Sequence, residues 1–113
     1  MPSRPIDFEV VRSIGGALPD VKDTSGPRGT ALKLKGKLLA CEAIHKSAEP
    51  HSLMVRISLK RREALLAQNA ATFYLTDHYK PYPAILVRLS RIKRAPLKEL
   101  LMESWQFVRE GAK

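Results

Sequence analysis

The sequence predicts an α+β domain with two layers: a five-stranded, largely antiparallel sheet with helices on one face, in the order α-β-β-β-α-β-β-α. Its 113 residues suit one domain, so we expect residues 1–113 to form a single unit. No strand–helix–strand unit repeats along the chain, which argues against a parallel sheet. Three helices are also too few to cover both faces of five strands, so one face is left to solvent or to a partner.

The first helix is predicted to begin after Asp7, whose side chain can cap the free N–H groups of the first turn. Ile6 and Val11 flank this start with the spacing of a hydrophobic staple. Pro19 ends the helix, and the turn-forming residues 19–29 predict a loop.

Three strands are predicted next. Residues 30–35 alternate strictly, with leucines on one face and lysines on the other. A tight turn at Lys35-Gly36, with Gly36 at positive φ, returns the chain into a second strand over 37–44. A third alternating strand follows over 53–59.

The second half of the chain is predicted to contain two helices and two strands. Ser58 caps a short helix over 59–68, and short strands follow over 73–75 and 84–89, joined by a loop with two prolines.

Pro96 opens the last helix at its first position. One face of this helix is apolar and includes Leu100, Leu101 and Val108, which we expect to pack on the sheet against Leu32, Leu34, Val55, Ile57 and Val87. Trp105 lies within the same stripe and is interpreted as a core anchor in preference to a binding platform.

Composition excludes several classes of protein. Hydrophobic residues make up 44% of the chain, which is too many for global disorder, and no apolar run is long enough for a membrane span. The N-terminus mixes charge with proline, so we expect no signal peptide. Cys41 is the only cysteine, which excludes an intrachain disulfide and favours a reducing, cytoplasmic setting.

Charge is the strongest functional signal. The net charge is +9, and residues 28–94 hold 14 of the 20 Lys and Arg with only four acidic residues. A basic central region between nearly neutral ends predicts a surface that faces a polyanion. The alternative is a generic cationic surface that serves solubility.

Three groups of residues are candidates for phosphate or base contact. Alternation places Lys33, Lys35, Arg56 and Arg88 on the uncovered sheet face. Lys60, Arg61 and Arg62 lie in the first turn of the second helix, where free N–H groups favour an anion; the alternative is a tolerated basic patch. Because a helix N-terminus disfavours cations, we expect their replacement by alanine to leave stability unchanged or slightly improved.

The third group lies in the loop before the last strand: His78, Tyr79, Lys80 and Tyr82. Aromatic rings among cations can stack on bases while the cations meet phosphates. The alternative is a two-proline turn whose tyrosines lie on the core. Arg91, Lys93 and Arg94 extend this basic tract or solvate the connection to the last helix.

No catalytic constellation is visible. The three histidines fall in predicted loops, Cys41 has no partner at metal-ligand spacing, and Gly15-Gly16 ends a helix where a phosphate loop would begin one. We therefore expect no enzyme activity, no cofactor and no metal site.

Residues 29–40, 59–89 and 97–108, together with ALPDV at 17–21, resemble the MmcQ/YjbR-like proteins of bacteria. The resemblance implies an α+β domain like the secretion-chaperone fold, with helices on one side of a five-stranded antiparallel sheet. Members are commonly labelled DNA-binding, and no agreed catalytic residues carry over. Lys37 lies where members usually show a lysine after a glycine turn, and His78 and Tyr79 lie in the usual histidine-bearing loop.

Two functions follow. The first is a cytoplasmic protein that binds DNA or RNA through phosphates with little base specificity and does not interact with membranes. The second is a protein-interaction or self-assembling module that pairs its open sheet face with a copy of itself or an acidic protein. A continuous positive surface on that face favours the first, and an apolar centre built from Leu38, Met54 and Leu86 favours the second.

Overall fold

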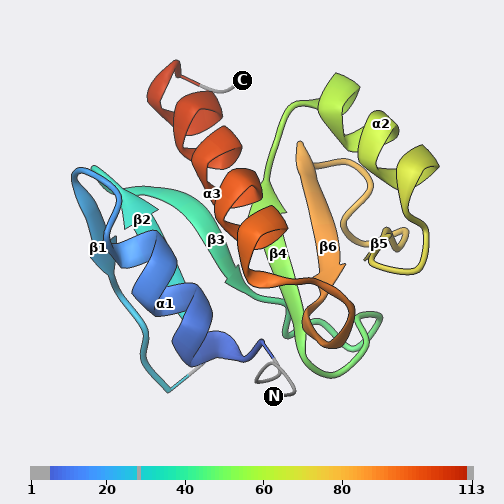
Figure 1. Cartoon of the computed structure of the whole chain (residues 1–113), viewed down its shortest axis with the longest axis horizontal. Coiled ribbons are helices and arrows are strands. Elements are labelled where there is room, and N and C mark those ends of the chain that lie inside the picture. Colours follow the sequence, from blue (N-terminus) through green and yellow to red (C-terminus); the bar gives the residue numbers. More distant parts are fainter. Residues whose placement is uncertain (1–5, 28, 112–113) are drawn as a thin grey trace.

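A computed structural model describes residues 6–27 and 29–111 of the chain. A single antiparallel sheet has the strand order β1-β2-β3-β4-β6-β5, and α1 and α3 lie across one of its faces (Figure 1). The elements are α1 (Phe8–Gly16), β1 (Val21–Asp23), β2 (Ala31–Leu34), β3 (Lys37–Glu42), β4 (Ser52–Arg56), α2 (Leu59–Gln68), β5 (Phe73–Tyr74), β6 (Ala84–Arg88), the 3-10 turn η1 (Leu89–Arg91) and α3 (Arg94–Arg109). The two-layer α+β prediction is confirmed.

The sheet has six strands where five are expected. The additional strand, β1, lies in the stretch predicted to be a loop, and it pairs antiparallel with β2 so that Val21 faces Leu34. A strand of three residues among turn-formers is too short to show an alternating pattern. Its strand conformation depends on its pairing with β2.

Helix boundaries follow local chemistry. The Asp7 carboxylate accepts a hydrogen bond from the Val10 N–H, and the Ser58 hydroxyl accepts one from the Arg61 N–H, so both predicted caps are confirmed. Leu59 opens α2, so the strand predicted over 53–59 ends earlier, at Arg56. The last helix begins at Arg94, two residues before the predicted Pro96, which still lies in the first turn, where a proline needs no N–H partner.

The β2–β3 hairpin contains a tight turn and a bulge. Lys35 and Gly36 both have positive φ, 51° and 84°, as a two-residue type I′ turn requires. The register then shifts between Leu32 and Lys33, which leaves Leu39 as the extra residue. The buried Ser104 hydroxyl of α3 donates a hydrogen bond to the Leu39 carbonyl at 3.1 Å and so ties the helix to the bulge.

The main core lies between α1, α3 and the sheet. Leu100, Leu101 and Val108 pack in one cluster with the predicted strand residues, so the assigned face of α3 is confirmed. Trp105 lies at the edge of this cluster and is only partly buried. Its Nε1 donates to the Pro19 carbonyl at 2.8 Å, so the residue anchors the connection between α1 and β1 to α3 while part of its ring faces a hollow.

The opposite face carries a second, smaller cluster. Met54 and Leu86 are 6% and 0% exposed, because Ala48, Tyr74 and Tyr79 pack over them. Met54 and Leu86 of the apolar centre that would favour a protein partner are thus covered by β5 and by the chain's own loops, while Leu38 is partly buried.

Candidate nucleic-acid interface

Five cations lie near the place where the C-terminal end of α3 meets the first three strands, on two sides of the sheet. Lys35, Lys37 and Arg109 line a hollow on the helix side, and Lys22 and Lys33 lie on the open face. We call this group the basic corner. The β1–β2 register places Lys22 directly opposite Lys33. Like charges in that position destabilise a sheet, and a bound anion would relieve the repulsion.

A hollow of about 200 Å3 opens at the corner, on the helix side of the sheet. Its wall is formed by Asp20, Leu34, Lys35, Lys37, Trp105, Val108 and Arg109. The Arg109 guanidinium lies 5.2 Å from the centroid of the Trp105 ring, and its charge is favoured in the last turn of α3.

Asp20 is the acidic residue among those that line the hollow. Lys35 Nζ lies 4.0 Å from Asp20 Oδ2, and both side chains are mostly exposed, so this ion pair contributes little. Among residues 6–27 and 29–111, it is the only ion pair that any of the five cations makes. The corner therefore keeps nearly all of its positive charge available to a ligand.

Arg62 does not form the anion site expected at the start of α2. It is 7% exposed, and its Nη1 donates to the carbonyls of Lys80, Tyr82 and Ala84 at 3.2, 2.8 and 3.4 Å. The guanidinium thus clamps the end of the β5–β6 loop onto α2. The expectation that its removal would leave stability unchanged is incompatible with this burial.

Lys60 and Arg61, the other two cations of this turn, have different surroundings from Arg62. Arg61 Nε donates to Glu103 of α3 at 3.0 Å, while Lys60 is exposed. The three side chains therefore do not converge on the free N–H groups at the start of α2, because successive helix positions point in different directions.

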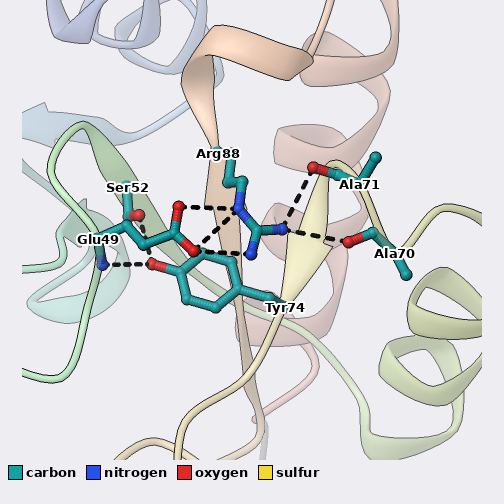
Figure 2. Close-up of polar contacts among 6 residues, drawn as sticks. All are labelled: Glu49, Ser52, Ala70, Ala71, Tyr74 and Arg88. Atoms are coloured by element: carbon teal, nitrogen blue, oxygen red, sulfur yellow. Dashed lines mark hydrogen bonds and ion pairs between the residues drawn. The ribbon is translucent and has the colours of Figure 1, made fainter.

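Arg88 is also committed internally (Figure 2). Its Nε and Nη2 donate to both carboxylate oxygens of Glu49 at 2.7–3.1 Å, and its Nη1 donates to the carbonyls of Ala70 and Ala71. The guanidinium stacks 4.2 Å from the centroid of the Tyr74 ring. Hydrogen bonding to Arg88 lowers the pKa of Glu49, and the same bonds raise the pKa of Arg88. The predicted phosphate contact by Arg88 is thus replaced by a structural one.

Arg56 is likewise withdrawn from the open face. Its guanidinium lies 5.9 Å from the ring centroid of Phe107 on α3, and its Nε is buried without a hydrogen-bond partner.

The predicted aromatic residues His78 and Tyr79 join the β5–β6 loop to the β3–β4 loop. The rings of His45 and His78 stack at 3.5 Å, and the Tyr79 hydroxyl accepts a hydrogen bond from the His45 N–H. Burial, then His78, then Lys46 lower the pKa of His45, and burial raises the pKa of Tyr79. Tyr79 lies on the smaller core as the alternative interpretation expects of the tyrosines, whereas Tyr82 is 55% exposed and Lys80 is exposed too.

The structure thus brings Lys35 and Lys37 of the predicted set together at the hollow, places Lys33 nearby on the open face and disperses the rest. Arg91, Lys93 and Arg94 are exposed at the opposite end of α3. Lys22, Trp105 and Arg109 were missed as site residues. Lys22 lies in the strand without a pattern, and Arg109 ends a helix that is nearly neutral overall. For Trp105, the available signal was an aromatic residue within an apolar stripe.

Other site classes have less support. Among the residues described, no three His, Cys, Asp or Glu side chains group as metal ligands. Burial, and then Glu42, raise the pKa of the Cys41 thiol. No helix in the described part of the chain is long and apolar enough to cross a membrane.

Comparison with known proteins shows the fold. No family model matches the chain. The crystal structure of Deinococcus radiodurans protein DR2400, which contains a DUF419 domain, is similar with a TM-score of 0.74 at 20% identity, covering 100% of this chain and 86% of that one. Uncharacterized protein Rv2570 of Mycobacterium tuberculosis and Mb2600 of Mycobacterium bovis are each 43% identical over 42 residues, 37% of this chain. The matched segment spans 33% of the length of these curated bacterial relatives.

Proposed function

We propose that this protein binds DNA or RNA at the basic corner, through phosphate contacts with little base specificity. The observation that carries the proposal is that Lys35, Lys37 and Arg109 line one hollow with a single carboxylate, that of Asp20, while Lys22 and Lys33 form a like-charge pair on the other side of the same part of the sheet. Phosphate contacts of this kind position nucleic acid without reading its sequence.

The proposal includes membership of the MmcQ/YjbR-like family, a role as a binding protein with no catalytic step, and a reducing, cytoplasmic setting. The sequence resemblance supports the first of these. The single, partly buried Cys41 supports the last.

Salt dependence of binding tests the proposal. If five phosphates are neutralised, log K for duplex DNA falls against log salt with a slope of about −4.5. Fluorescence anisotropy with labelled random duplexes and single strands measures this slope. Replacing Lys22, Lys33 and Lys37 by glutamine flattens it by about 2.7, since each lost contact removes about 0.9.

A matched triple variant controls for bulk charge. Replacing Lys46, Lys93 and Lys98 by glutamine changes the net charge equally but touches exposed positions outside the corner. Its slope stays near that of the wild type. Equal flattening in both variants would contradict the site, and no binding at about 50 mM salt would contradict the function.

A second candidate function is a self-assembling module. A groove of about 410 Å3 on the open face is lined in part by Pro27, Ala31, Cys41 and Ile44, and Ile44 is 61% exposed. Sedimentation at increasing protein concentration tests self-association: a dimer that Ile44→Asp abolishes supports this function, and a monomer at every concentration contradicts it.

A further inference from the structure

The hollow of the basic corner combines a flat aromatic wall with cations. Trp105 and the apolar side chains of Leu34 and Val108 form part of its wall, with Lys35 and Lys37 beside them. Its volume of about 200 Å3 is below the roughly 300–1,000 Å3 of sites for drug-sized ligands, so it suits one planar ring system.

The Trp105 ring is held in place before any ligand arrives. Its Nε1, the only hydrogen-bond donor of an indole, is committed to the Pro19 carbonyl at 2.8 Å. The part of the ring that lines the hollow therefore offers a ligand an aromatic surface and no donor, beside the Arg109 guanidinium 5.2 Å from the ring centroid. Stacking on such a face tolerates every base, because all bases present a π-system.

A free phosphate would use the lysines but leave the apolar wall unoccupied. A duplex would present phosphates while its bases remain stacked inside. Only an unpaired nucleotide offers a ring for Trp105 and a phosphate for Lys35 and Lys37 together, which is the combination used by proteins that bind single strands.

Resting on the proposed function, we infer that the hollow binds one unpaired nucleobase, so that the basic corner prefers single-stranded nucleic acid to duplex.

Trp105 is the only tryptophan of the chain, so its fluorescence reports on the hollow alone. A single-stranded oligonucleotide is expected to quench it saturably, whereas a duplex of the same sequence and inorganic polyphosphate leave it nearly unchanged. Anisotropy of a labelled strand, recorded in the same titration, reports binding anywhere on the protein.

These two signals separate the hypotheses. Binding by anisotropy without quenching overturns the inference and leaves the proposed function intact. Equal quenching by polyphosphate makes the hollow a phosphate site and overturns base stacking. No binding by either signal overturns the proposed function and the inference with it.

Substitutions give an independent test. Asp20 has φ of 62°, a conformation that asparagine tolerates, so Asp20→Asn removes the carboxylate charge without straining the turn. The affinity for single strands is expected to rise about two- to fivefold, which is the size of effect typical of one exposed charge–charge interaction. Asp77→Asn, an equal charge change on the β5–β6 loop, leaves affinity unchanged; an equal rise in both variants would overturn the inference.

Trp105→Leu is expected to weaken single-strand binding roughly 5- to 150-fold, the range for losing one stacked base, and to leave duplex binding unchanged. Trp105→Phe keeps a ring and retains most of the affinity. A Leu variant that is folded by circular dichroism and binds single strands as the wild type does would overturn the inference.

Discussion

Replacing Arg62 by alanine tests the corrected role of this residue. Its Nη1 carries two N–H groups that serve three carbonyls of the segment 80–84, the closest at 2.8 Å. Hydrogen bonds that involve a charged group contribute about 1.5–3 kcal/mol each, and the buried guanidinium offsets part of this gain through its desolvation. We expect Arg62→Ala to lower the free energy of unfolding by about 2–4 kcal/mol.

Urea unfolding followed by circular dichroism measures this loss, and the melting temperature is expected to fall by roughly 10–15 °C for a chain of this length. Arg62→Met keeps most of the aliphatic packing and separates it from the hydrogen bonds. Lys60→Ala, an exposed cation in the same helical turn, serves as the control and stays within about 0.5 kcal/mol of the wild type. If Arg62→Ala and Lys60→Ala have equal stability, Arg62 does not clamp the loop.

Three further predictions concern stability and titration. Ser104→Ala removes the donor to the Leu39 carbonyl at the bulge and is expected to lower the free energy of unfolding by about 1–2 kcal/mol in urea; a neutral effect would show that the bulge does not need this bond. Hydrogen bonds from Ser25, and then Arg12, lower the pKa of Asp23 to about 2 from the usual 3.8, so stability falls as the pH drops from about 4 through 2, and Asp23→Asn flattens this part of the profile. His78→Ala removes a stacked ring and a neighbouring charge from His45, so NMR titration should show a higher pKa for His45; an unchanged pKa would mean that the stack does not control it.

Local features of the fold could be predicted from sequence because their causes are local. The caps Asp7 and Ser58 and the turn glycine Gly36 act within a few residues of themselves. The alternation of Leu32 and Leu34 likewise fixes which face packs on the helices. Strand β1 could not be predicted, because its pairing with β2 is its only cause.

The site was harder to predict for a related reason. In sequence, Arg62, Arg88 and Lys37 are equivalent cations, and only distant partners distinguish them. Arg62 finds carbonyls 18–22 positions away, and Arg88 finds Glu49 39 positions away. Lys37 meets no carboxylate partner within the part of the chain described. Internal hydrogen bonds thus commit Arg62 and Arg88 to the fold and leave the lysines of the hairpin available.

An NMR titration with a short single-stranded oligonucleotide tests most directly whether the basic corner is the nucleic-acid interface. Backbone amide shifts are expected to concentrate at Lys22, Lys33, residues 35–37 and Arg109, together with the single indole N–H of Trp105, and to fade as salt is raised. Shifts that concentrate instead at Arg91, Lys93 and Arg94 at the start of α3, or no shifts at low salt, would contradict the account.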